Sequence, residues 1–240
     1  MSQAGQVFFF RSRRTVFLPA LRCKIGIEAG SEGGWVAPLV AAIAKDIAYI
    51  VLYAGPALSY ADEMQYESED RLRLAGFSGD ELKAALEFRK NFRDMIRSGE
   101  ALTDEGWAKV QAMAQKAKHE KWFLYVRPAQ KRDWRQSKLA LMLKFDPQPL
   151  WEQTSNPVLV LYGERDRNVP AAKNVVALES ALKKAGNKDY RIIVFPKANH
   201  EGLEAETGGE EEFPYLKRYV TGYLDTPINW ILKRVEVSPQ

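Results

Sequence analysis

Two almost continuous apolar runs place the strongest constraint on how this chain can fold. One covers residues 47–53 (Ile-Ala-Tyr-Ile-Val-Leu-Tyr) and the other covers residues 157–163 (Pro-Val-Leu-Val-Leu-Tyr-Gly). Runs without alternating polar residues are typical of parallel strands that are buried on both faces of a sheet. Shorter apolar runs lie at residues 24–27 and 190–196, and helical patterns separate the four. This alternation predicts an α/β fold, in which helices wrap a mostly parallel sheet.

The middle of the chain has a different residue pattern, because it consists of helical patterns without strands. Residues 62–74, 79–97 and 103–118 carry apolar side chains at spacings of three and four, with charges between them. Ser78 and Thr103 each precede two acidic residues and are predicted to be helix N-caps.

This change from strand patterns to helical patterns predicts two domains. We expect a helical cap, or lid, over residues 61–143 and an α/β core made of residues 1–60 and 144–240. Within the second part of the core, residues 171–185 are predicted to form an amphipathic helix, and residues 215–235 are predicted to carry the last helices.

The composition excludes several classes of site and location. Cys23 is the only cysteine, so an intrachain disulfide, a zinc knuckle and an iron–sulfur cluster are excluded. With only two histidines, no histidine-rich metal centre is expected, and no cofactor is predicted. No apolar run approaches the roughly 20 residues that a membrane span needs. The N-terminus places its apolar residues before its arginines, the reverse of a secretory signal, so we expect a cytoplasmic protein.

Charge is unevenly distributed along the chain. The net charge of +4 is too small to indicate a nucleic-acid partner, yet residues 83–144 hold 15 Lys and Arg against 7 Asp and Glu. We interpret this excess, and His119 within it, as a solvated helix face; binding to an acidic surface is the alternative. Four tryptophans in or just after this stretch are interpreted as core of the cap rather than as a substrate platform: Trp107, Trp122, Trp134 and Trp151.

A tight turn after the first core strand points most directly to chemistry. Ser31 stands within the segment Gly30-Ser31-Glu32-Gly33-Gly34, between a predicted strand and a predicted helix. A serine at such a bend, flanked by glycines because side chains would clash there, is the physical form of a nucleophile elbow. The helix that follows directs free N–H groups at the serine and stabilises negative charge on a bound oxygen. A purely structural turn is the alternative interpretation.

A nucleophilic serine needs a base, and the base needs an acid that orients it. Asp166 follows one predicted strand and His200 follows the next. Open α/β sheets place their sites at the carboxyl ends of the strands, so we expect Ser31, Asp166 and His200 to act together. Glu164 is a competing carboxylate in the same loop as Asp166.

Three segments resemble the catalytic blocks of the α/β-hydrolase fold family: residues 25–35, 158–170 and 195–202. More closely, the chain is similar to bacterial carboxylesterases and S9/S33-peptidase-like serine hydrolases that carry a helical cap. The resemblance covers roughly residues 24–234.

The resemblance implies a role for each matched residue. Ser31 corresponds to the nucleophile, Asp166 to the acid and His200 to the base. The backbone N–H of Glu32 corresponds to one donor of the oxyanion hole. Trp35 and Gly30 are predicted to contact the substrate.

The chain departs from the family pattern in two places. Ala29 replaces the first glycine of the Gly-x-Ser-x-Gly motif, and only 22 residues precede Cys23, where the family has about four strands. The loop that carries the second oxyanion donor is therefore missing upstream, and an N-terminally truncated α/β-hydrolase core is expected. Residues 6–11 and 15–18 are predicted substitutes for the missing strands. Alternatively, a second copy of the chain covers the open sheet edge, which gives a homodimer.

The resemblance implies a serine hydrolase that cleaves small carboxylic esters, with short to medium acyl or aryl groups, through an acyl-enzyme on Ser31. One alternative is a peptidase or amidase that uses the same three residues. Another is a catalytically weak remnant of the fold that acts as a binding module. Ester hydrolysis that is lost in Ser31→Ala distinguishes the enzymes from the binding module.

Overall fold

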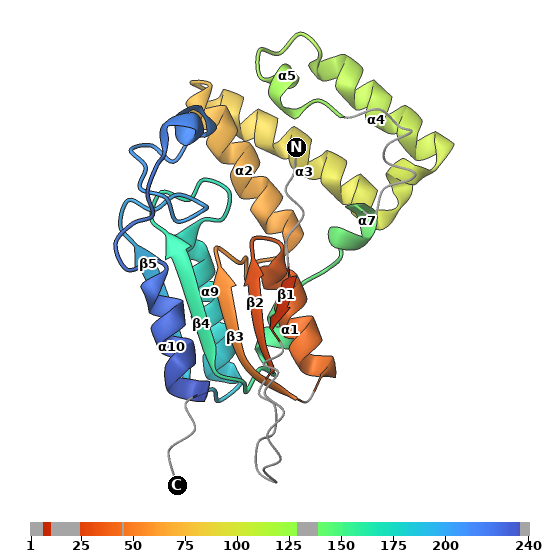
Figure 1. The fold of residues 1–240 in the computed structure, drawn as a ribbon. Helices are drawn as coiled ribbons and strands as arrows, with labels where there is room; N and C mark the ends of the chain where they lie inside the picture. Colours follow the sequence, from red (N-terminus) through yellow and green to blue (C-terminus); the bar gives the residue numbers. More distant parts are fainter. Residues whose placement is uncertain (1–6, 11–24, 45, 129–138, 236–240) are drawn as a thin grey trace, which may run out of the picture. The chain divides into compact units, whose positions relative to one another are not determined.

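The computed structural model describes residues 7–10, 25–44, 46–128 and 139–235 (Figure 1). Contacts between residues divide the chain into two compact units. The first unit comprises Met1–Leu58 together with Pro147–Gln240, and the second comprises Ser59–Asp146.

The first unit is built on a five-stranded sheet with the order β1-β2-β3-β4-β5. The strands are β1 (Val7–Phe10), β2 (Ile25–Gly30), β3 (Ile47–Tyr53), β4 (Val158–Gly163) and β5 (Tyr190–Phe195). Strands β2 to β5 run parallel, whereas β1 pairs antiparallel with β2. The predicted, mostly parallel sheet is therefore confirmed. Gly30, Tyr53 and Leu161 pair in succession across β2, β3 and β4, so the strands end at a common edge.

Strand β1 lies where the sequence predicted that N-terminal strands are missing. Residues 7–10 pair with β2, so the first of the two predicted substitute strands is confirmed. The second, at residues 15–18, lies outside the described residues.

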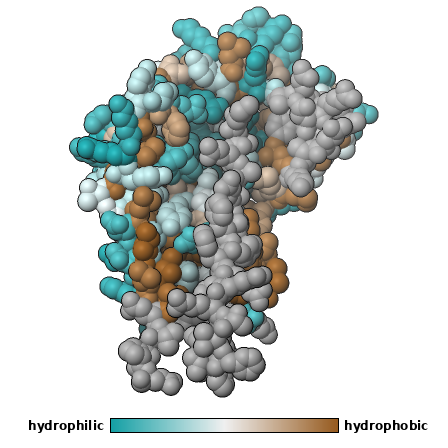
Figure 2. All heavy atoms as spheres, in the orientation of Figure 1, coloured by the Kyte–Doolittle hydropathy of each residue, from teal (hydrophilic) through white to brown (hydrophobic). Residues whose placement is uncertain are grey.

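Helices lie on both faces of this sheet. The helices α1 (Gly33–Ile43), α8 (Gln148–Trp151) and α9 (Ala171–Lys184) contribute to the core on one face. Helix α10 (Asp225–Val235) contributes Trp230 to the core on the other face. Side chains alternate between the faces along each strand, and both faces are buried, which explains the continuous apolar runs of β3 and β4. Apolar residues also gather on the surface over α10, where Leu224, Ile228 and Leu232 are 48%, 55% and 46% exposed (Figure 2).

The last part of the first unit is less helical than predicted. A short 3-10 helix, η2, covers Glu210–Tyr215, and α10 begins only at Asp225. The segment between them forms a bridge from Tyr219 to Leu203 and turns at Gly222, whose φ is 82°. The prediction of helix from residue 215 onward is therefore wrong for residues 216–224, because this segment pairs with a distant loop.

The second unit is helical. It contains α2 (Tyr60–Leu74), α3 (Gly79–Ser98), η1 (Glu100–Leu102), α4 (Asp104–Ala117), α5 (Phe123–Val126) and α7 (Leu139–Met142). Thr103 caps α4 as predicted, since its hydroxyl accepts the N–H of Gly106 at 3.0 Å. Ser78 occupies the N-cap position of α3, but its side chain makes no capping hydrogen bond, so that part of the prediction is wrong. Ser59, which the sequence analysis passed over, caps α2.

Aromatic side chains form the interior of the second unit. Trp122 lies against Phe88, and Trp107 lies against Phe92. Both tryptophans are buried, as predicted for core of the cap. Trp151 is buried too, but it belongs to the core of the first unit, so the prediction that it lies in the core of the cap is wrong. Trp134 lies outside the described residues.

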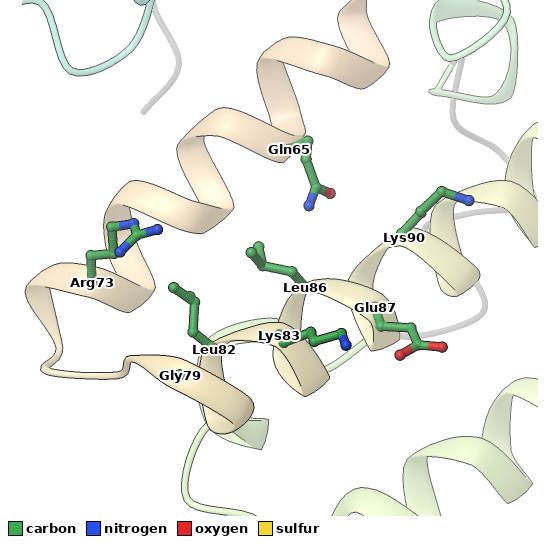
Figure 3. A pocket seen from close by; sticks show the side chains of 8 residues that line it. All are labelled: Gln65, Arg73, Gly79, Leu82, Lys83, Leu86, Glu87 and Lys90. Carbon is green, nitrogen blue, oxygen red and sulfur yellow. The ribbon is translucent and has the colours of Figure 1, made fainter.

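A groove of about 500 Å³ lies between α2 and α3 (Figure 3). Leu82 and Leu86 line it together with Arg73, Lys83 and Lys90. Two of these cations are already in ion pairs: Arg73 contacts Glu69 at 2.7 Å, and Lys90 contacts Asp94 at 2.8 Å. Of the two, only Lys90 belongs to the basic region of residues 83–144, and its exposed ion pair agrees with the interpretation of that region as a solvated helix face.

Candidate active site

Ser31 lies directly after β2 in a strained backbone conformation. Its φ of 50° falls in the left-handed region, which non-glycine residues rarely adopt. The Ser31 N–H donates to the carbonyl of Tyr53 at 2.9 Å, and the Gly34 N–H donates to the carbonyl of Ser31 at 2.8 Å. These bonds hold the turn between β3 and the start of α1. Strain of this kind is concentrated at functional sites.

The glycines after Ser31 are required by close packing. A Cβ at Gly34 would lie 2.6 Å from the backbone of Gly55 and Pro56. A Cβ at Gly33 would lie 2.6 Å from the Cβ of Ala29, the residue that replaces the first glycine of the motif. The methyl group of Ala29 is therefore accommodated because Gly33 has none, and the bend survives the departure from the motif.

Helix α1 begins just after the turn with its N–H groups uncapped by a side chain. Glu32 is the N-cap residue, and its side chain makes no capping hydrogen bond. Within the described part of the chain, no hydrogen-bond acceptor is found for the Glu32 backbone N–H. A free N–H at a helix N-terminus carries partial positive charge and suits an oxyanion. The predicted role of this N–H stays a prediction.

The two residues predicted to contact substrate have different surroundings. The indole N–H of Trp35 donates to the carbonyl of Leu58 at 2.8 Å, which ties α1 to the loop after β3. A Cβ at Gly30 would make only an ordinary contact, 3.6 Å from the carbonyl oxygen of Tyr53. The predictions for Trp35 and Gly30 also stay predictions.

Asp166 and His200 come together in the loops after β4 and β5. The carboxylate Oδ2 of Asp166 lies 2.8 Å from Nδ1 of His200. Its other oxygen, Oδ1, accepts the N–H groups of Asn168 and Val169 at 2.9 and 2.8 Å. The side chain of Asp166 has no exposed surface, and that of His200 is 16% exposed. The backbone bonds orient the buried carboxylate so that Oδ2 faces the imidazole.

Glu164, the competing carboxylate, makes a different contact. Its Oε2 accepts the backbone N–H of Lys197 at 2.9 Å. Asp166, and not Glu164, is therefore the carboxylate that bonds to His200. The bond from Lys197 to Glu164 links the loop after β4 to the loop after β5.

The two loops are joined by backbone bonds as well. The N–H of Arg165 donates to the carbonyl of Ala198 at 2.9 Å. A Cβ at Gly163 would lie 2.4 Å from the carbonyl oxygens of Ala198 and Asn199, so only glycine fits at this strand end. Asn199 is 4% exposed, and its Oδ1 accepts the N–H groups of Glu201 and Leu203. Gly163 was expected only to end a strand, and no role was predicted for Asn199, although an asparagine directly before a histidine is a detectable signal.

A buried asparagine on α9 holds the loop after β3, which packs against the turn at Ser31. Asn174 has no exposed surface, and its Oδ1 accepts the N–H groups of Ala57 and Leu58 at 2.6 and 3.1 Å. The sequence analysis missed this residue as well. One polar residue on the apolar face of a predicted helix is the signal that could have indicated it.

Two tyrosines lie on the α10 face of the sheet, with ring centroids 6.1 Å apart. Burial is the main cause that raises the pKa of Tyr53 and of Tyr223. The charge of Glu28 raises the pKa of Tyr53 further, and that of Asp166 raises the pKa of Tyr223 further. Both hydroxyls are therefore protonated at neutral pH. Burial also raises the pKa of the Glu28 carboxyl.

The structure thus joins two of the three predicted residues directly and places the third at the same edge of the sheet. Asp166 and His200 share a hydrogen bond, and Ser31 follows β2 at the carboxyl ends of the parallel strands. A buried carboxylate that orients an imidazole, with a strained serine at a helix N-terminus on the same edge of the sheet, is the set of groups that acyl transfer uses.

Among the described residues, no three His, Cys, Asp or Glu side chains are grouped so that they could hold a metal ion. No helix within the same ranges combines the length and the apolar character that crossing a membrane requires.

The chain matches one protein family. The family described as BAAT / Acyl-CoA thioester hydrolase C terminal matches residues 16–203. A comparison with curated proteins found no match.

Several solved structures resemble the chain at low identity. A thermophilic esterase from Thermogutta terrifontis is 18% identical, with 89% of this chain and 66% of that chain covered and a TM-score of 0.42. Proline iminopeptidase from Mycobacterium smegmatis is 14% identical, with 87% and 65% covered and a TM-score of 0.43. An alpha/beta hydrolase enzyme from a deep-sea metagenome library of the Medee basin is 12% identical, with 90% and 68% covered and a TM-score of 0.42. The chain thus spans about two thirds of the length of these structures.

Proposed function

Because the chain belongs to the BAAT / acyl-CoA thioester hydrolase C-terminal family, we propose that it is a serine hydrolase that cleaves carboxylic esters through an acyl-enzyme on Ser31. His200 is the general base, and Asp166 orients its imidazole. The substrate is a small ester with a short to medium acyl or aryl group.

One observation carries the proposal more than any other. The Oδ2 of Asp166 lies 2.8 Å from Nδ1 of His200, while two backbone N–H groups hold Oδ1. A carboxylate held in this way accepts a hydrogen bond from Nδ1–H, which leaves the Nε2 lone pair to take the proton of a nucleophile. The strained serine at the end of β2 supports Ser31 as that nucleophile.

The reaction proceeds in two halves, formation of the acyl-enzyme and its hydrolysis. The Ser31 Oγ attacks the carbonyl carbon and forms a C–O bond while its proton passes to His200 Nε2. The bond to the leaving alcohol then breaks, and His200 returns the proton to the alcohol oxygen. Water attacks the acyl-enzyme in the same manner, which releases the carboxylic acid and restores the Ser31 hydroxyl.

Charge on the carbonyl oxygen is stabilised at the start of α1. The backbone N–H of Glu32, with no acceptor among the described residues, donates to the oxyanion. Loss of one donor from an oxyanion hole typically lowers turnover about 10²–10³-fold, so a second donor decides how fast the enzyme is.

Acyl thioesters are the second candidate substrates, and the family match specifically favours them. A thiol has a pKa of about 8.5, so it leaves the acyl group as a thiolate with little help from an acid. An alkoxide is far more basic and needs the proton from His200. Amides need still more stabilisation of the transition state, so the peptidase alternative is less favoured than either ester.

A paired assay tests the proposal. Hydrolysis of p-nitrophenyl butyrate and of butyryl-CoA is compared for the wild type, Ser31→Ala and Ser78→Ala. Ser78 is a matched control, because its side chain makes no capping hydrogen bond. A fluorophosphonate probe with mass analysis of the labelled peptide identifies the nucleophile without depending on the substrate.

The expected result is hydrolysis and labelling at Ser31 in the wild type and in Ser78→Ala, with both lost in Ser31→Ala. A higher kcat/KM for butyryl-CoA selects the thioester candidate. Folded wild-type protein that neither hydrolyses the substrates nor reacts with the probe contradicts the proposal and favours the binding module.

A further inference from the structure

Tyr223 is an almost fully buried aromatic residue, and neither half of the proposed reaction uses it. It lies two residues before α10 and is 3% exposed. Its ring centroid is 5.2 Å from that of Phe195, at the end of β5, and 6.1 Å from that of Tyr53, at the end of β3. The ring therefore bridges the carboxyl ends of two strands that are not neighbours in the sheet.

The same ring lies directly against the loop that carries His200. A Cβ at Gly202 would lie 2.3 Å from the Cε1 and Cζ atoms of Tyr223, and Gly202 has a φ of 80°. Only glycine fits between this loop and the ring. The position of the loop is thus limited by the aromatic surface beneath it.

Backbone bonds join the two segments beside this contact. The N–H of Val220 donates to the carbonyl of Gly202 at 3.0 Å, and the N–H of Glu204 donates to the carbonyl of Arg218 at 2.9 Å. The N–H of Tyr223 donates to the carbonyl of Val220 at 3.1 Å, which closes the turn that presents the ring. The His200 loop and the Tyr223 turn therefore form one packed assembly.

We propose that Tyr223 is a positioning residue, whose ring holds the His200 loop so that the imidazole meets the buried carboxylate of Asp166. It acts through packing and not through its hydroxyl. A smaller side chain leaves a gap under Gly202, the loop moves into it, and the bond between Asp166 and His200 lengthens. Displacement of a reacting group by about 1 Å can lower the rate about 100-fold.

The test compares Tyr223→Phe, which keeps the ring, with Tyr223→Leu, which removes it. Tyr215→Leu is the matched control, because Tyr215 is a 77% exposed tyrosine in the preceding segment. The activity measurement rests on the proposed function. A second readout does not: the downfield NMR resonance of the Nδ1 proton that His200 shares with Asp166. His119 is the only other histidine, so His119→Gln completes the assignment.

For Tyr223→Leu, kcat is expected to fall about 10–100-fold with KM changed less than about threefold, and the shared-proton resonance to shift or broaden. Tyr223→Phe and Tyr215→Leu should keep kcat and KM within about twofold of the wild type and leave the shared-proton resonance in place. A resonance unchanged in folded Tyr223→Leu overturns the inference, even if the wild type hydrolyses nothing. An equal loss in Tyr223→Phe overturns it too, because the hydroxyl would then carry the effect.

Discussion

The Oδ2 atom of Asp166 lies 2.8 Å from the Nδ1 atom of His200, although 34 positions separate the two residues in the sequence. The second carboxylate oxygen is occupied by the N–H groups of Asn168 and Val169. Since both of those groups are donors, the carboxylate cannot rotate without the loss of two hydrogen bonds. This arrangement fixes which ring nitrogen carries the proton, and the first prediction follows from it.

Asp166→Asn is expected to lower kcat about 10³–10⁴-fold while the protein stays folded. The two backbone N–H groups hold the amide oxygen, so the amide NH₂ faces Nδ1 and donates to it. The proton then moves to Nε2, the wrong tautomer for a base. Steady-state hydrolysis and circular dichroism measure the two effects. Glu164→Gln is the control and should stay within about threefold of the wild type, while more than a tenth of the activity remaining in Asp166→Asn would contradict the prediction.

Ser31→Gly is expected to raise the free energy of unfolding by about 1 kcal/mol and to abolish hydrolysis. Glycine adopts the left-handed conformation without the strain that Ser31 bears, and this gain exceeds the entropy cost of a glycine. Ser31→Ala keeps the strain and should show no gain. Urea unfolding of the two variants makes the comparison, and equal stabilities would show that the turn is relaxed.

Gly33→Ala is expected to destabilise the protein by about 2 kcal/mol, because its new methyl group meets that of Ala29. The same change made in an Ala29→Gly background should cost less. A double-mutant cycle measured by urea unfolding should therefore give a coupling energy of about 1–3 kcal/mol. Additive effects would mean that Gly33 is required for some other reason.

Glu28→Gln is expected to raise the thermal midpoint at pH 8 but not at pH 4. Burial raises the pKa of Glu28 in the folded state, so folding favours the protonated carboxyl. Stability from this group is present below the unfolded pKa and declines as the pH rises through the folded pKa. Glutamine removes that decline, and the midpoints of the two proteins should converge in acid. Differential scanning calorimetry at several pH values checks this; a difference of the same size at both extremes would contradict it.

The homodimer expected from the sequence covers the edge left open by the missing strands, on the side of β2, where β1 now pairs. We propose that a second copy docks instead at the opposite edge, because β5 has β4 as its only neighbour among the described strands. Unpaired strand edges pair readily with a second chain, and a lysine there opposes it. Val194 on β5 is 41% exposed, so Val194→Lys should halve the mass measured by light scattering. Val176→Lys, at a 67% exposed valine of α9, is the control. A wild type with the mass of one chain would contradict the dimer.

Much of the fold could be predicted from sequence because its causes are local. A run such as residues 157–163, without polar alternation, has few stable solutions other than a strand buried on both faces. Helix α9 ends at Lys184, within a residue of the predicted end, because Gly186 supplies a left-handed turn. Ser31, Asp166 and His200 could be proposed from the sequence because each follows a strand whose end is visible there.

The sequence by itself therefore determined the parallel core and where along the chain polar groups follow its strands. Only the tertiary structure decided which groups meet. Glu164 and Asp166 are equivalent as carboxylates, and the backbone donors at Asn168 and Val169 direct Asp166 toward His200. Residues 216–224 are not helical because they pair with the loop at residues 202–204. Local patterns limit each residue's conformation, but hydrogen bonds and close packing between distant residues depend on the path of the whole chain.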